Sequence, residues 1–101
     1  LAEARIELQQ LDAAAAALDE AIAARADQPM AHYNRALVHE AQGRPAEAIT
    51  DYEAEIAISP KLHQPRFNLA KLLAAAGRHA EALAHFRAAV DLEPGFGTGY
   101  L

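Results

Sequence analysis

The stretch AQGRPAEAI at residues 41–49 returns 34 positions later as AAGRHAEAL at residues 75–83. When residues 29–62 are laid over residues 63–96 without a gap, ten of the 34 positions are identical, and several other pairs are conservative. A period of this length, kept without any insertion, indicates a solenoid built from similar supersecondary units.

Each unit reads as two helices joined by a glycine turn. Gly43 and Gly77 close the first helix, because glycine readily adopts the left-handed conformation that follows a helix end. Pro45 stands in the first turn of a second helix, where a missing N–H is tolerated. Ala48 and Ala82 are small, and we expect them to let the two helices of a unit approach closely. We predict first helices at about residues 29–42 and 63–76, and second helices at residues 45–58 and 79–92.

Composition narrows the class of protein. The 101 residues are rich in Ala, Leu, Glu and Arg, which is typical of helices, and include no Cys. The nine Lys and Arg residues are scattered and the net charge is -5, so we expect no nucleic-acid partner. No apolar run approaches the roughly 20 residues that span a bilayer, so we expect no membrane segment. The abundance of Ala and Arg favours a bacterial source with a GC-rich genome.

The repeat resembles the tetratricopeptide repeat, or TPR, a 34-residue helix–turn–helix unit. The family pattern of a small residue, Gly, Ala, an aromatic residue and Pro is met twice. The matching residues are Ala36, Gly43, Ala48, Tyr52 and Pro60, then Ala70, Gly77, Ala82, Phe86 and Pro94. Ala is usual after the aromatic residue; Ala89 conforms, whereas Glu55 departs. The resemblance implies an all-α superhelix.

The flanks of the two full units fit the same frame. Residues 1–28 look like a partial, degenerate repeat, in which Gln9 replaces the turn glycine. Residues 97–101 look like the start of a further helix. We therefore interpret residues 1–101 as one TPR array and as a fragment of a longer array or of a larger protein. The chain opens at Leu1 without Met, which leaves room for a preceding segment; no signal peptide is recognisable, and we favour a cytoplasmic location.

In TPR proteins the first helices line a concave groove that holds an extended peptide or a helix of a partner. Carried over by position, the resemblance implies that Glu3, Glu7, Ala41, Ala74 and Ala75 border this groove. The groove residues that we single out are Met30, Tyr33, Asn34, Leu37, Glu40, Gln64, Phe67, Asn68 and Lys71.

Two pairs within this set invite alternative interpretations. Asn34 and Asn68 lie one repeat apart, and their amides suit pairing with a peptide backbone; the alternative is a local backbone or water partner. Tyr33 and Phe67 offer apolar contact to a ligand, or else they pack against the neighbouring unit.

Charge along the groove is uneven. Glu3, Glu7 and Glu40 make its N-terminal end acidic, with Lys71 opposite, which favours a ligand that is basic at one end; solvated charges are the alternative. Some chaperone-binding members of the family grip a C-terminal carboxylate with Lys, Arg and Asn. Of those positions only Asn34 matches here, so we do not expect that mode.

Catalytic and metal motifs are missing from the sequence. His32 and His39 are seven residues apart on one helix face, which is not the i, i+4 spacing of a helical zinc site, and we expect both to be packed between helices. Arg35 occupies a usually apolar position and needs an acidic partner, such as Glu7 or another acid of the first unit. The GFGTG stretch at residues 95–99 follows no strand, so we interpret it as a turn or a chain end.

These observations favour a protein-interaction module without catalysis and without a cofactor. Its expected partner is a protein or peptide. Two alternatives stay open: a substrate-recruiting segment of a multidomain enzyme, and a structural module that self-associates end to end.

Overall fold

The computed structural model describes residues 2–25 and 27–92, with side chains from residue 7 onward, and these residues form only helices and connecting turns. The helices are α1 (Ala2–Ala24), α2 (Ala31–Ala41), α3 (Pro45–Ile58), α4 (His63–Ala75) and α5 (His79–Leu92). The predicted second helices are confirmed at both ends, and the predicted first helices within two residues. The expectations for residues 95–99 and 97–101 lie outside the described residues.

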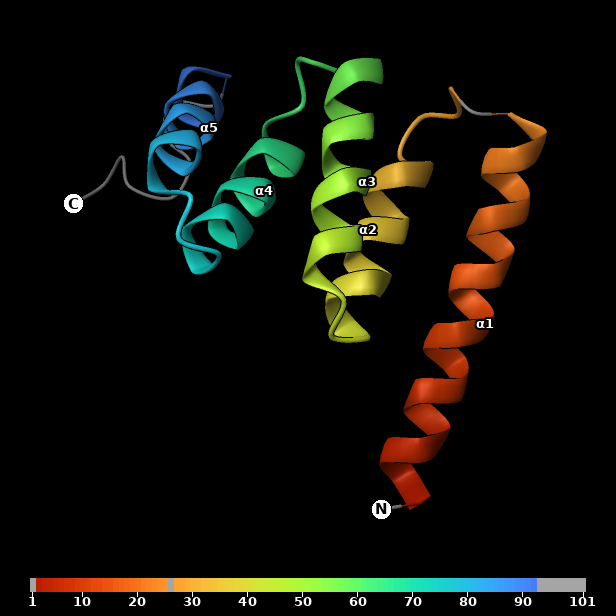
Figure 1. Ribbon diagram of the computed structural model, residues 1–101. Coiled ribbons are helices and arrows are strands. Elements are labelled where there is room, and N and C mark those ends of the chain that lie inside the picture. Colours follow the sequence, from red (N-terminus) through yellow and green to blue (C-terminus); the bar gives the residue numbers. More distant parts are fainter. Residues whose placement is uncertain (1, 26, 93–101) are drawn as a thin grey trace.

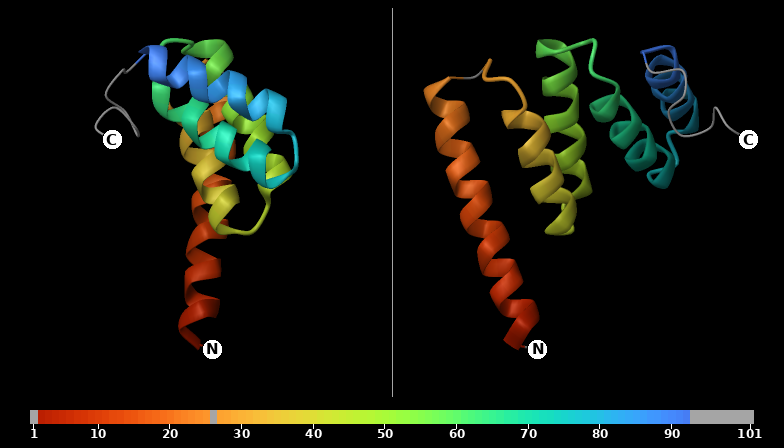
Figure 2. Two further views of the ribbon diagram at one scale, coloured as in Figure 1. Left: turned by 90° about the vertical axis from the view of Figure 1, so that its left-hand side faces the viewer. Right: turned by 180° about the vertical axis from the view of Figure 1, so that it is seen from behind.

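The five helices follow one another in a row, each packed against the next one in the chain (Figure 1). The α1–α2 and α3–α4 links lie at one edge of the row, uppermost in Figure 1. The α2–α3 and α4–α5 turns lie at the opposite edge, and Figure 2 shows the same alternation from behind. This arrangement is the α–α solenoid expected from the 34-residue period.

Both glycine turns close in the same way. Gly43 and Gly77 have φ values of 77° and 84°, in the left-handed region. The N–H of Arg44 donates to the carbonyl of His39 at 2.8 Å, and 34 residues later the N–H of Arg78 donates to the carbonyl of Leu73 at 2.8 Å. These bonds satisfy carbonyls that the helix end leaves without partners. A Cβ at either glycine would meet open space, so backbone conformation alone demands glycine there.

The core lies among α2, α3, α4 and α5. Ala36, Ala48 and Ala70 are fully buried there, and Ala82 nearly so. The larger members of this cluster are Ile49, Tyr52, Leu69 and Leu73. Helix α1 adds little to the core: among residues 7–25 only Ala15 is buried.

Helix α1 differs from the two later units because it has no turn. It runs unbroken through Gln9, which stands in register with Gly43 and Gly77. Gln is a good helix former and strongly disfavours the left-handed conformation, so the helix continues where glycine would end it. Its N-terminal end projects past the other helices (Figures 1 and 2).

The start of α2 is held by a buried carboxylate from α3. Glu55 is fully buried, and its two oxygens accept the N–H groups of Met30 and Tyr33, each at 3.1 Å. Met30 precedes the helix with φ 69° and gives no side-chain cap, which explains why α2 begins at Ala31, later than predicted. Glu55 thus satisfies two of the N–H groups that a helix start leaves open, and its charge suits the positive end of the helix dipole.

We predict that Glu55→Ala lowers the free energy of unfolding by about 2–4 kcal/mol, because two N–H groups lose their buried acceptors. Glu55→Gln keeps one acceptor oxygen and should lose less. Urea unfolding followed by circular dichroism measures both. The matched control is Glu53→Ala, an exposed glutamate two positions away on α3, which should change stability by no more than about 0.5 kcal/mol. Equal losses at Glu53 and Glu55 would contradict the capping role.

Candidate functional site

The residues predicted for the groove divide into two classes by exposure. On α2, Asn34 and Leu37 are exposed, and Leu37 retains 40% of its surface. On α4, Gln64 and Lys71 are exposed. Positions three or seven residues apart lie on one side of a helix, so each pair projects from a common face. These four side chains are available to a ligand.

Asn34 and Asn68 differ in environment although they are one repeat apart. Asn34 is exposed, whereas Asn68 is half-buried and donates its amide Nδ2–H to the Tyr33 hydroxyl at 3.2 Å. That bond links α2 to α4, so Asn68 joins successive units. The two amides are therefore not equivalent.

Tyr33 also packs against the next helix. Its ring lies 5.8 Å from the Tyr52 ring, centroid to centroid, at 58°. The Tyr52 hydroxyl in turn donates a short hydrogen bond to a Glu40 carboxylate oxygen. Burial, followed by this bond to Glu40, raises the pKa of Tyr52 far above its ordinary value. The hydroxyl therefore stays protonated as a donor, and the Glu40 carboxylate is bound within the fold.

The N-terminal end of the predicted groove carries less negative charge than expected, because Glu40 is bound to Tyr52. With Glu40 bound to Tyr52, Glu7 is the exposed carboxylate that remains of the predicted set in the described part of the chain. The Glu3 side chain lies outside that part. Lys71 stays at the surface, and its Nζ lies 5.3 Å from the centroid of the Phe67 ring, a cation–π distance.

Phe67 contacts its own unit. Its ring meets the Phe86 ring edge to face at 5.5 Å, joining α4 to α5. The rings of Phe67 and Tyr33 thus both pack onto the second helix of their own unit, whereas the alternative interpretation of the sequence expected the neighbouring unit. Each keeps part of its surface. Met30 lies apart from them, in a hollow at the edge formed by the inter-unit links.

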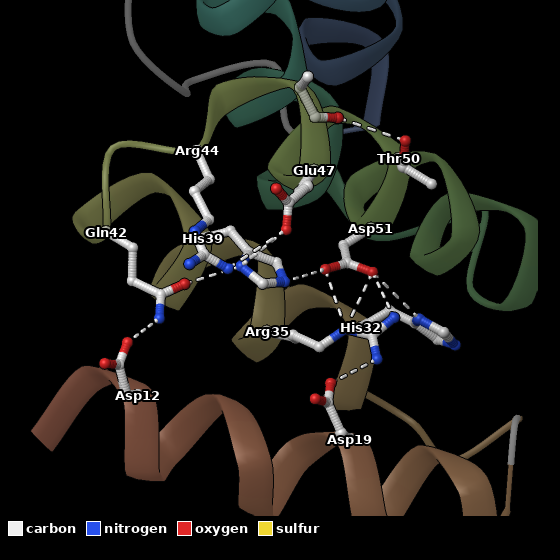
Figure 3. Close-up of polar contacts among 11 residues, drawn as sticks. Asp12, Asp19, His32, Arg35, His39, Gln42, Arg44, Glu47, Thr50 and Asp51 are labelled. Atoms are coloured by element: carbon white, nitrogen blue, oxygen red, sulfur yellow. Dashed lines mark hydrogen bonds and ion pairs between the residues drawn. The ribbon is translucent and has the colours of Figure 1, made fainter. Parts of the chain in front are cut away.

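A second cluster, absent from the predicted site, surrounds Asp51 on α3 (Figure 3). The Asp51 carboxylate is buried and accepts the Arg35 guanidinium at 2.7–3.1 Å through both oxygens. His39 Nε2 lies 3.5 Å and His32 Nδ1 3.7 Å from the same carboxylate. Hydrogen bonding to Asp51 raises the pKa of Arg35, against the opposing effect of burial.

The Asp51 cluster reaches across to α1. Arg35 Nη1 donates to Asp19 at 2.9 Å, and Gln42 donates to Asp12 at 2.7 Å (Figure 3). The expectation that Arg35 pairs with an acid of the first unit is confirmed with Asp19 in place of Glu7. A hollow of about 530 Å³ opens beside this contact, bordered by Ala15 and the Asp51 cluster.

The next inter-unit contact is apolar at the corresponding positions. Leu69 and Leu73 stand 34 residues after Arg35 and His39, and both are fully buried. Ile49 stands 34 residues after Ala15. The α1 contact is therefore made by charged groups around a hollow, whereas the α3–α4 contact is made by branched side chains.

Sequence reasoning assigned no role to Asp51 or Glu55. Each departs from the matching position of the other unit, where His85 and Ala89 stand, and that departure is the signal that could have found them. The need of Arg35 for an acid pointed to the cluster but did not identify its main partner. Among the residues that the structure describes, no group of His, Asp and Glu is placed to hold a metal ion, and no helix is long and apolar enough to cross a membrane.

Comparison with known proteins decides the family. A tetratricopeptide repeat model matches residues 1–63, and a second model of the same description matches residues 64–96. The chain belongs to the tetratricopeptide repeat family. It is an all-α TPR superhelix, and TPR units typically serve as protein-interaction scaffolds.

Solved TPR structures of MamA resemble the chain closely. One crystal structure of MamA has a TM-score of 0.82 and 28% identity, with 91% of this chain and 54% of that chain covered. A crystal structure of MamA protein has a TM-score of 0.77 and 27% identity, with 98% and 54% covered. MamA AMB-1 has a TM-score of 0.77 and 25% identity, with 87% and 52% covered. The chain spans about half the length of these MamA structures, and no curated protein matches it by sequence.

The Asp51 cluster yields a test of coupling. We predict that Asp51→Ala costs about 2–3 kcal/mol, because it leaves Arg35 mostly buried without its main partner. Adding Arg35→Leu, which copies Leu69, should restore at least about 1 kcal/mol relative to the sum of the single losses. Denaturant unfolding of the four proteins gives this double-mutant cycle. Asp19→Ala, at an exposed carboxylate, is the control and should cost under about 1 kcal/mol. Simple additivity of the two losses would refute the coupling.

Tyr52 yields a test at alkaline pH. A tyrosine titrates near pH 10 in the unfolded chain, but the native state keeps the Tyr52 proton because its pKa is raised. Stability contributed by this difference is intact below pH 10 and falls as pH rises above it, by about 1.4 kcal/mol per pH unit. Urea unfolding of the wild type and of Tyr52→Phe at pH 8, 10 and 11 measures the effect. The variant should show the shallower decline; parallel declines would refute the assignment.

Proposed function

We propose that the chain is a protein-interaction module that binds an extended peptide or a helix of a partner along the α2 and α4 faces, without catalysis of its own. One observation carries the proposal. Asn34 and Leu37 are exposed one turn apart on α2, although their neighbour Ala36 is fully buried. An exposed leucine beside a free amide offers apolar contact and backbone pairing at one place.

The side chains divide the work of recognition. Asn34, with its amide exposed, pairs with the ligand backbone, and Leu37 contacts a ligand side chain. Gln64 and Lys71 extend the surface along α4, and Lys71 attracts an acidic group on the ligand. Tyr33 and Phe67 support this surface from below, because both already pack on second helices. Met30 and Glu40 border it at its ends.

A second candidate, self-association, has one observation in its favour. Leu83 on α5 is 49% exposed, although Ile49, its counterpart one repeat earlier, is only 9% exposed. Another copy could cover α5 as α4 covers α3. Light scattering against protein concentration distinguishes this candidate from peptide binding.

The test of groove binding uses Asn34→Ala together with Asn68→Ala. Each lost amide pair removes roughly 1 kcal/mol, so the double variant should bind a partner captured by the wild type about 10–30-fold more weakly. Captured proteins are identified by mass spectrometry, and the affinity of each is then measured by titration calorimetry.

The matched control is Tyr33→Phe, which removes the hydroxyl that accepts from Asn68 but leaves both amides in place. If the amides act on the ligand, this variant should bind as tightly as the wild type. Unchanged binding by a folded double variant would overturn the proposal. Equal weakening by Tyr33→Phe would show that the Asn68 bond acts only through the scaffold.

A further inference from the structure

An apolar hollow of about 430 Å³ lies between the end of the α1–α2 link and the α3–α4 link, at the edge that is uppermost in Figure 1. We call it the edge pocket. Its walls are almost entirely apolar, and Lys61 is the charged residue among those that line it. It is lined by Pro29, Met30, Ser59, Pro60, Lys61 and Leu62. Apart from Met30, it shares no residue with the proposed groove.

The fold holds this pocket in one shape. Met30 has φ 69°, a conformation that costs a residue with a side chain roughly 1 kcal/mol, and buried Glu55 keeps it there through the Met30 N–H. Pro29 and Pro60 stiffen the two links. A preformed pocket orders little on binding, so more of the contact energy remains as affinity.

The left-handed residue of this junction has no counterpart one repeat later. Gln64 stands one repeat after Met30, and its helix starts from Leu62 in ordinary extended conformation. The left-handed residue is therefore an addition to the repeat pattern.

The charges beside the pocket favour an acidic ligand. Lys61 is exposed at the wall, and Arg66 is anchored beside it through hydrogen bonds of 3.3 Å from its guanidinium to the Pro60 carbonyl. On the other link, Arg25 and Asp27 pair with each other at 3.0 Å. Among the residues that the structure describes, neither Lys61 nor Arg66 forms an ion pair with a carboxylate, in a chain whose net charge is -5.

We propose that the edge pocket docks one large apolar side chain from an acidic segment of a partner protein. The apolar side chain enters against Met30 and Leu62, and flanking carboxylates meet Lys61 and Arg66. The volume accommodates a leucine or a phenylalanine. Docking here is separate from binding along α2 and α4, so one partner could use both surfaces or two partners could bind together.

The single methionine of the chain makes the pocket directly observable. Met30 is labelled with a ¹³C methyl group, and its resonance is followed during titration with the peptide acetyl-Asp-Glu-Phe-Leu-Asp-Glu-amide. We expect a saturable shift of that resonance. The basic peptide acetyl-Lys-Arg-Phe-Leu-Lys-Arg-amide should bind at least about 10-fold more weakly, because it meets like charges.

Two variants locate the contact, measured by anisotropy with the fluorescein-labelled acidic peptide. Met30→Gly removes the apolar wall while glycine adopts φ 69° freely, so the fold is kept and binding should weaken at least about 10-fold. Lys61→Glu reverses the exposed charge and should weaken binding to a similar extent. The Asn34→Ala, Asn68→Ala double variant is the control and should bind this peptide as tightly as the wild type.

Several results would overturn the proposal. One is a Met30 resonance that does not move, or that moves equally with the basic peptide. Another is a loss of binding in the Asn34/Asn68 variant with none in Met30→Gly, which would assign the peptide to the groove. A third is a Met30 shift on raising protein concentration without peptide, together with dimers in light scattering, which would make a second copy the occupant. Loss of groove binding alone would leave the edge-pocket result unaffected.

Discussion

Each helix pair in this solenoid leaves one apolar face that only the following helix can cover, and the rest of the structure depends on that contact. Tyr52 is fully buried because α4 lies over α3, while its counterpart Phe86 on α5 stays partly open. Small residues such as Ala48 bring the helices of a pair close enough for this contact to form. Stability therefore accumulates along the array, one interface at a time.

The two complete interfaces of this type use different chemistry. Between α3 and α4, Leu69 and Leu73 supply apolar burial, which depends little on salt or pH. Between α1 and α2, the contact depends on Arg35, whose bonds to Asp51 and Asp19 were made at the expense of hydration. The same scaffold thus carries a firm junction and one whose strength varies with the ionic surroundings.

The structural features that recur in both full units could be predicted from the sequence alone. Gly43, Gly77 and Pro45 act on the backbone nearest to them, so the turns and the second helices could be predicted to the residue. The candidate site could be predicted only in part. Asn68 and Tyr33 are joined by a hydrogen bond between residues 35 positions apart, and Glu55 caps α2 from 25 positions away. Contacts of that range leave no local pattern. The only sign in the sequence that α1 is continuous is Gln9, a helix former at the position where the later units have glycine.

The positions where the two full units disagree are the ones that give the chain its individual chemistry. Residues shared by both units satisfy the demands of stacking and are common to any such array. Glu55 in place of alanine permits the strained Met30, and Met30 in turn forms a wall of the edge pocket, so two departures from the repeat act together on one feature. Backbone strain such as that at Met30, and a buried carboxylate such as that of Glu55, each lower stability. They persist only where the surrounding structure compensates for them. Recognition by a particular partner is therefore to be sought where the repeat is broken, with the repeated residues as its scaffold.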